Sequence, residues 1–136
     1  MSSQLNVDTI VDKAGSGGTN VKIGNTSVTV AEGGSATMNT VQGLLKAWVF
    51  SHSDATLTDS FNLASGTDNS EGNYTFAFTN NMGDSNGSGA GSATDNSDRT
   101  VTIHTRSTSS YVVNIFNSGA NYKDSRNRTM INGDLA

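Results

Sequence analysis

The hydrophobic positions of this chain form short alternating runs between polar, glycine-rich segments. The clearest run is residues 73–79 (NYTFAFT), where Tyr74, Phe76 and Phe78 alternate with smaller residues. A period of two places these three rings on one face of a strand. Similar runs predict further strands at residues 47–50, 55–63, 100–106 and 111–116. The run at residues 111–116 has apolar residues on both faces, which is typical of a central strand. Together, these runs predict an all-β fold.

The large apolar residues gather in residues 46–82, which contain the only Trp and four of the five Phe. A buried aromatic side chain removes roughly 150–250 Å² from water, so a few of them dominate a small core. The predicted core consists of Trp48, Phe50, Phe61, Phe76, Phe78, Val113 and Ile115, with Ile103 also buried.

One polar residue interrupts the apolar phase of the run at 55–63. Leu57, Phe61 and Leu63 share a strand face with Asp59. Asp59 is therefore either paired in that position or the mark of a β-bulge, in which one extra residue shifts the register.

Three regions follow from these patterns. Residues 1–38 hold only brief apolar runs, such as those around Val7 and Val28, between glycine-rich breaks, and predict an extended N-terminal arm. Residues 39–46 predict a short helix, since Val41, Leu44 and Leu45 fall on one helical face, with a plain linker as the alternative. Residues 47–136 are predicted to form a small antiparallel β-sandwich domain, with its regular strands ending near Phe116.

Two polar segments of that domain are predicted to connect strands. Residues 68–73 (DNSEGN) favour a turn, because Asp and Asn bond their own backbone and Gly tolerates positive φ. Residues 83–98 contain no apolar side chain larger than Ala and predict a long surface loop.

Composition narrows the function classes. The net charge is −4, with 8 Lys and Arg against 12 Asp and Glu, which argues against a nucleic-acid partner. The chain has no Cys, and no apolar run reaches the roughly 20 residues of a transmembrane helix, so we expect no membrane insertion. Its first residues lack the basic and apolar regions of a signal peptide, so we expect assembly in a cytoplasm.

The low apolar fraction indicates self-association. Hydrophobic residues make up 33% of the chain, against roughly 45–50% in ordinary domains. A single copy would bury little apolar surface and be marginally stable. Apolar faces shared between copies would supply the missing core.

No residue pattern indicates catalysis, a cofactor or a metal. His52 stands beside Ser51, Ser53 and Asp54, but neighbours along a strand or turn do not point at one another as a catalytic triad requires. The polar clusters at residues 68–71 and 95–98 invite calcium, yet they lack the EF-hand pattern, and turn chemistry explains them more simply. We therefore expect a protein that is not an enzyme, with no catalytic, cofactor-binding or metal-ligating residue.

Several short motifs resemble a known group of proteins. They are residues 46–50 (KAWVF), 59–62 (DSFN), 67–69 (TDN), Gly72, 74–76 (YTF), 78–79 (FT) and, in the arm, 5–10 (LNVDTI). Together they resemble the small β-rich C-terminal domain and the N-terminal start of short tail-fibre-like virion proteins of marine phages and prophages. Residues 117–136 extend past the usual end of that domain.

The resemblance implies a bacteriophage structural protein, most simply a short homotrimeric tail fibre assembled in the host cytoplasm and located in the virion. Residues 1–38 would anchor it to other virion proteins through Leu5, Val7, Thr9 and Ile10, and the far end would contact the host surface. Two other interpretations stay open: a capsid decoration or head-fibre protein, and a module that binds a host surface glycan.

Overall fold

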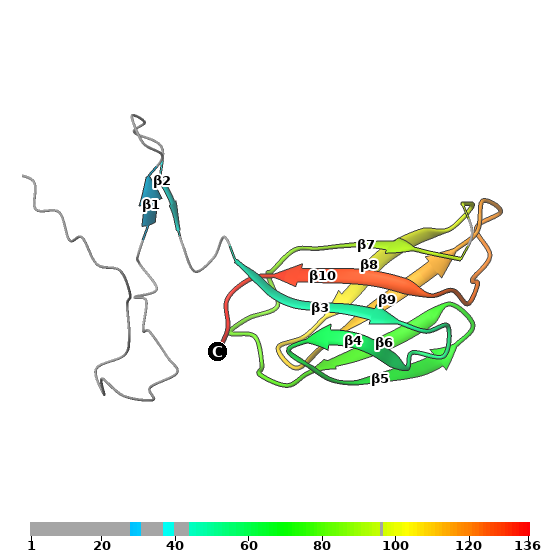
Figure 1. Ribbon diagram of the computed structural model, residues 1–136, viewed down its shortest axis with the longest axis horizontal. Coiled ribbons are helices and arrows are strands. Elements are labelled where there is room, and N and C mark those ends of the chain that lie inside the picture. The colour runs from blue at the N-terminus through cyan, green and yellow to red at the C-terminus, as the bar shows by residue number, and fades with distance from the viewer. Residues whose placement is uncertain (1–27, 31–36, 40–43, 96) are drawn as a thin grey trace, which may run out of the picture. The chain divides into compact units, whose positions relative to one another are not determined.

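The computed structural model describes residues 28–30, 37–39, 44–95 and 97–136 (Figure 1). The chain divides into two units, residues 1–41 and 42–136. In the first, β1 (Val28–Val30) pairs antiparallel with β2 (Thr37–Asn39). The brief apolar run noted around Val28 thus forms a strand, whereas no run was noted at β2. The anchoring residues Leu5, Val7, Thr9 and Ile10 lie outside the described residues.

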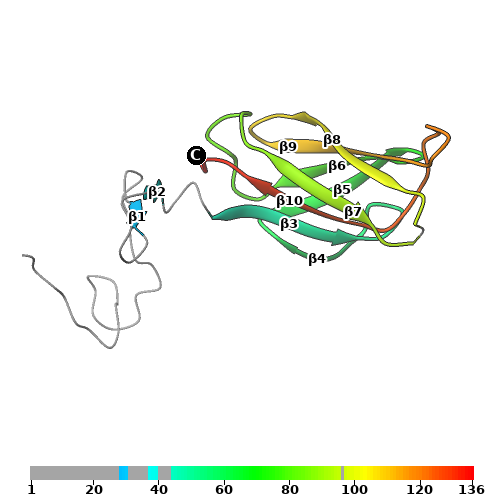
Figure 2. The same ribbon diagram turned by 90° about the horizontal axis from the view of Figure 1, so that it is seen from above.

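The second unit is a sandwich of two four-stranded sheets (Figures 1 and 2). One sheet has the order β4-β3-β10-β7 and contains β3 (Leu45–Ser51), β4 (Leu57–Phe61), β7 (Gly89–Ala93) and β10 (Asn127–Asn132). The other has the order β5-β6-β9-β8 and contains β5 (Leu63–Ser70), β6 (Asn73–Phe78), β8 (Thr100–Arg106) and β9 (Ser110–Phe116). Every strand pair is antiparallel, which confirms the all-β prediction for the described residues.

The described part of the chain contains no helix, so none there is long and apolar enough to cross a membrane. The short helix predicted at residues 39–46 is wrong at both ends. Asn39 belongs to β2, and Leu45 and Lys46 belong to β3, while residues 40–43 lie outside the described residues. Lys46 and Ala47 are buried, and this burial in the sheet outweighs the weak helical spacing of so short a segment.

The core between the sheets is centred on β6 and β9. Phe76, Phe78, Val113 and Ile115 are buried there as predicted, and Ile103 is partly buried against them. The ring of Tyr111 stacks at tilted angles on both phenylalanines, with centroids 5.4 Å from Phe76 and 5.6 Å from Phe78. The alternation read in residues 73–79 therefore identifies a core-facing strand.

The core prediction is wrong for the aromatic residues of β3 and β4. Phe61 is exposed, and Trp48 and Phe50 are only half-buried. On β3 the inward positions belong to the smaller Ala47 and Val49, which are fully or almost fully buried. Because side chains alternate between the two faces of a strand, the rings at 48 and 50 must lie on the outer side.

A β-bulge explains the position of Asp59. Phe50 lies opposite Asp59, but the next residue, Ser51, lies opposite Leu57, so one residue of β4 is extra. The bulge reverses the phase: Leu57 packs against the core, whereas Asp59 and its neighbour two positions on, Phe61, point outward. The bulge interpretation of Asp59 is thus confirmed.

The loop prediction at residues 83–98 misses β7, an edge strand. Its Gly89 and Gly91 face the core: a Cβ atom on Gly89 would lie 2.6 Å from Cδ1 of Ile131, and one on Gly91 would lie 2.6 Å from Cγ2 of Thr129. The missing side chains let β7 pack close to larger neighbours. Such a strand has no hydrophobic period for a sequence pattern to detect.

The regular structure does not end near Phe116, because β10 lies in the middle of its sheet, between β3 and β7. The segment that leads to β10 is fixed by Asp124, whose carboxylate lies 2.9 Å from the Tyr74 hydroxyl and accepts the Gly72 N–H at 2.7 Å. Residues beyond Phe116 therefore complete the sandwich instead of forming a tail.

Candidate functional site

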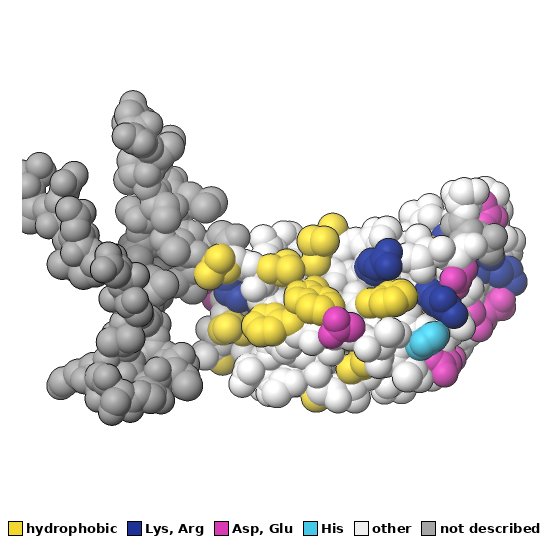
Figure 3. All heavy atoms as spheres, viewed as in Figure 1, with side chains coloured by type: hydrophobic (Ala, Val, Ile, Leu, Met, Phe, Trp, Pro, Cys, Tyr) yellow, Lys and Arg dark blue, Asp and Glu magenta, His cyan; other side chains and the backbone are white. Residues whose placement is uncertain are grey.

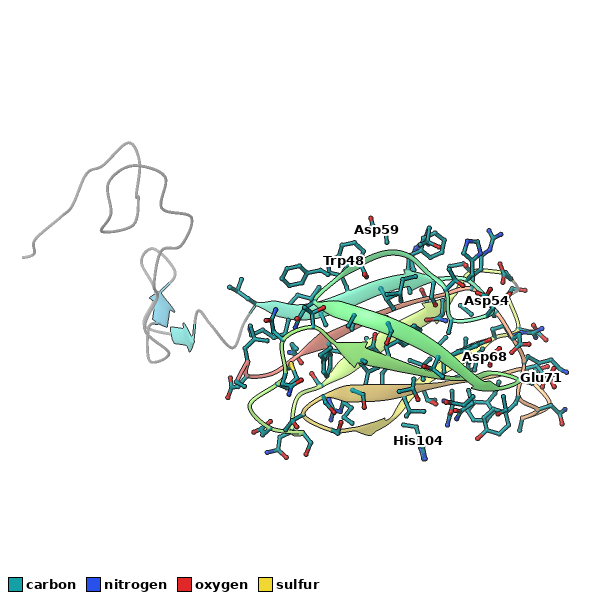
Figure 4. The ribbon with its side chains drawn as sticks, turned by 90° about the horizontal axis from the view of Figure 1, so that it is seen from below. Trp48, Asp54, Asp59, Asp68, Glu71 and His104 are labelled. Atoms are coloured by element: carbon teal, nitrogen blue, oxygen red, sulfur yellow. The ribbon has the colours of Figure 1, made fainter. Side chains whose placement is uncertain are left out.

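The side chains of β4, β3 and β10 that point away from the core form a continuous surface, which we call the outer face. It consists of Trp48, Phe50, Asp59, Phe61, Arg128 and Met130. Figure 3 shows apolar side chains gathered on this side of the sandwich, with acidic and basic groups among them. Figure 4 shows Trp48 and Asp59 together on one side and His104 on the opposite side.

Strand pairing arranges the outer face in two rows that run across the sheet. The apolar row has Trp48 in the middle, with Phe61 of β4 on one side and Met130 of β10 on the other. The charged row has Phe50 in the middle, with Asp59 of β4 and Arg128 of β10 on either side. Directly opposite side chains in an antiparallel pair lie close enough to interact, so each row is one contact surface.

The apolar row is open to water. Phe61 is 53% exposed and Met130 is 50% exposed. The patch continues to the start of β3, where Leu44 is 57% and Leu45 is 43% exposed. Single exposed apolar residues are ordinary, but a contiguous group of this kind is a candidate binding surface.

In the charged row, the Phe50 ring lies between the Asp59 carboxylate and the Arg128 guanidinium. The guanidinium carbon of Arg128 lies 4.6 Å from the centroid of the Phe50 ring, a cation–π contact. The Asp59 carboxylate accepts the backbone N–H of Ser60 at 2.9 Å. Neither side chain forms an ion pair within the described residues.

A second surface feature is a polar hollow of about 350 Å³ at one end of the sandwich, lined by Asp84, Asn86, Gly87, Ser88, Asn132, Gly133 and Asp134. Its hydrogen-bonding groups are largely engaged with one another. Asn86 donates its backbone N–H and its side-chain amide to the Asp84 carboxylate, at 2.8 and 2.9 Å. Asn132 Oδ1 accepts the Ser88 backbone N–H at 3.0 Å. Such internal pairing leaves few groups directed at a ligand.

The clusters considered for calcium are held by local contacts. Glu71 forms an ion pair with Lys123 at 2.6 Å, and Asp98 forms one with Arg99 at 2.6 Å. Asp95 accepts the backbone N–H of Arg126 at 2.6 Å. Within the described ranges, no three His, Cys, Asp or Glu side chains come together in a geometry for a metal ion.

The histidines considered for catalysis lie on different parts of the sandwich. His52 lies in the turn after β3, while His104 is exposed on β8 of the other sheet. The Asp54 carboxylate accepts the backbone N–H of Thr56 at 2.9 Å, and this hydrogen bond lowers the pKa of Asp54. The Asp54 side chain thus stabilises the turn between His52 and Thr56.

Sequence reasoning placed Trp48, Phe50 and Phe61 in the core and assigned no role to Arg128 or Met130. A signal was present in residues 127–132 (NRTMIN), where Arg128 and Met130 alternate with Thr129 and Ile131. A period of two in that segment indicates a strand with one face outward.

No known protein family, curated protein or solved structure matches this chain.

Proposed function

We propose that this protein is a structural protein of a phage virion, most simply a short homotrimeric tail fibre or fibre-like appendage. The observation that carries the proposal is the outer face, an apolar sheet surface that one copy leaves in water although the chain has few apolar residues to spare. A subunit built to be covered by other copies has this property. The motifs that resemble tail-fibre-like proteins, such as residues 46–50, supply the phage assignment.

In this proposal the two units have different tasks. Residues 1–38 bind other virion proteins, with Leu5, Val7, Thr9 and Ile10 as the gripping side chains. The sandwich of residues 42–136 forms the body of the fibre, and its distal end contacts the host surface. The protein has no catalytic role, cofactor or metal in this proposal, and acts by assembly alone.

Locating the protein on intact particles tests the proposal. Labelled antibodies raised against the sandwich are expected to mark the tail in electron micrographs. Labelling of the capsid surface would instead favour a decoration or head-fibre protein and keep the virion role. Absence of the protein from purified particles would overturn the proposal.

Deletion of residues 1–12 tests the anchoring step. The shortened protein is expected to keep the circular dichroism spectrum of the sandwich and to be missing from particles. A matched control replaces the same residues with a shuffled sequence of equal composition. Incorporation of the shortened protein at the normal level would place the anchor elsewhere in the chain.

A host glycan-binding module is a second candidate, favoured by the half-buried ring of Trp48 and the exposed ring of Phe61 beside the carboxylate of Asp59. Aromatic rings pack on sugar rings, and carboxylates accept hydrogen bonds from sugar hydroxyls. Changes in Trp48 fluorescence on titration with host surface polysaccharide would detect such binding.

A further inference from the structure

We infer that the outer face is the contact between copies of this chain, with β3 nearest the symmetry axis and Asp59 of one copy against Arg128 of the next. The inference rests on the self-assembly part of the proposed function and names the surface that performs it. It is independent of the phage assignment, because purified protein alone should assemble through this face.

The first argument is that the face offers more apolar contact than hydrogen bonding. The row of Phe61, Trp48 and Met130 presents two rings and a thioether and no carboxylate or amide. A sugar needs several directed hydrogen-bonding groups around its ring, whereas a protein interface buries an apolar centre with charges beside it. Aromatic residues, Met and Arg are the residue types enriched in protein interfaces, so a protein occupant fits this face better.

The second argument is charge complementarity. Asp59 and Arg128 lie on opposite sides of Phe50 in one row. Rotation about an axis parallel to β3 keeps each row at its height and brings the β4 side of one copy to the β10 side of the next. The Asp59 carboxylate then meets an Arg128 guanidinium from the neighbouring copy, and each charge gains the ion-pair partner that it lacks among the described residues of its own copy.

The same rotation pairs the apolar row. Phe61 of one copy meets Met130 of the next, and a thioether against a ring edge is a favourable contact. Trp48 and Phe50, the middle residues of the two rows, come nearest the axis. A two-fold axis running across the strands would instead place each charge against the apolar row and leave it unpaired, at a cost in free energy. The arrangement of residues therefore selects an axis along the strands.

Both a two-fold and a three-fold axis along β3 satisfy this pairing, and the proposed homotrimer requires the three-fold axis. In that arrangement the three sheets surround the axis with their outer faces inward, and each copy contributes Asp59 to one neighbour and Arg128 to the other. Leu44 and Leu45, exposed at the start of β3, extend the apolar contact along the axis.

A charge-swap series measured by sedimentation tests the inference. The wild-type full chain is expected to sediment as a trimer at micromolar concentration. Asp59→Arg and Arg128→Asp should each place like charges in the contact and weaken assembly by about 30-fold or more. The double variant Asp59→Arg/Arg128→Asp should restore assembly to within about threefold of wild type, because the pair is re-formed with reversed polarity.

The matched control is Asp68→Arg, which makes the same charge reversal at an exposed position on β5 of the other sheet and should leave assembly unchanged. Circular dichroism should show that all variants keep the sandwich. Mixing the two single variants gives a second readout. In a three-fold ring built from both single variants, two copies of the same variant must be neighbours, so one like-charge contact remains and assembly should recover only in part. In a two-fold pair of one Asp59→Arg copy and one Arg128→Asp copy, both contacts join opposite charges, and assembly would recover fully.

Trp48 supplies a spectroscopic check, since it is the only Trp of the chain. Its emission should shift to longer wavelength on dilution of wild type and already be shifted in Asp59→Arg.

A wild-type protein that stays monomeric at micromolar concentration would overturn the inference, as would single variants that assemble normally or a double variant that does not recover. A monomer whose Trp48 emission responds to polysaccharide would assign the face to a glycan. Assembly through this face by a protein absent from particles would refute the virion role alone.

Discussion

The Tyr111 hydroxyl lies 2.9 Å from the Thr129 hydroxyl oxygen, and this hydrogen bond connects the two sheets inside the core. Tyr111 belongs to β9 and Thr129 to β10, and both side chains are almost completely buried. The bond therefore satisfies two polar groups that water does not reach.

Tyr111→Phe is expected to lower the free energy of unfolding by about 1–3 kcal/mol, because it leaves the Thr129 hydroxyl buried without its partner. Urea denaturation measures the change. The control is Tyr111→Phe/Thr129→Val, in which both polar groups are gone, and it should lose less than the single variant. A single variant as stable as wild type would show that the bond contributes nothing.

The stability of the sandwich should fall in alkali. Burial raises the pKa of Tyr111, and burial together with the hydrogen bond to Asp124 raises the pKa of Tyr74, both above the ordinary value of 10.0. Above pH about 10 the unfolded chain loses these two protons while the folded chain keeps them, so the free energy of unfolding decreases as pH rises. Below that pH both states hold the protons, and this contribution is constant.

Urea denaturation at a series of pH values from 8 to about 11.5 checks this sign. Tyr111→Phe removes one of the two groups and should give a shallower decline than wild type. A decline of equal slope in both proteins would show that other groups cause the alkaline loss.

Gly91→Ala is expected to destabilise the sandwich. The new Cβ would lie 2.6 Å from Thr129 Cγ2 and 2.9 Å from Val101 Cγ1, so β7 must move away from the core, at a cost of about 1–3 kcal/mol. Ser92→Thr is the control, because its extra methyl group lies one residue away on the outward side of the same strand. Thermal unfolding compares the two, and equal melting temperatures would mean that β7 packs less closely than described.

Asn127→Val is expected to raise stability by about 1 kcal/mol or more. The side-chain amide of Asn127 is buried, and neither its oxygen nor its nitrogen has a hydrogen-bond partner within the described residues. It lies opposite Ser51, whose buried hydroxyl also has none there. Replacing an unsatisfied polar group with an apolar one of similar shape removes its desolvation cost. A less stable variant in urea denaturation would indicate that Asn127 binds internal water.

The strands that could be predicted from the sequence are those whose apolar residues occupy a single phase. In β6, Tyr74, Phe76 and Phe78 fall on one face with smaller residues between them, so the pattern defines both the strand and its core side. In β3 the apolar residues occupy both phases, and ring size wrongly favoured Trp48 over Val49 as the core residue.

The candidate site was hidden because it depends on strand pairing. Asp59 was recognised as out of place among apolar residues, but its position in the charged row appears only when β3 lies between β4 and β10. Arg128 is more than 60 positions from Asp59 in sequence and shares its row only through that order. No hydrophobic pattern marked β7, because its glycines have no side chain. That absence of a Cβ atom is what allows β7 to pack closely against the core.

The position of β10 has a consequence for synthesis. Among the strands of this sandwich it is the last to leave the ribosome, yet it lies between β3, which is made first in this sheet, and β7. Until residues 127–132 emerge, the inner edge of β3 has no neighbour and the outer face lacks both Arg128 and Met130. A chain that stops early therefore carries the acidic half of the proposed contact without the basic half. In the proposed assembly, such chains could neither complete the sheet nor join a ring of finished copies, so the strand order would restrict assembly to chains translated through β10.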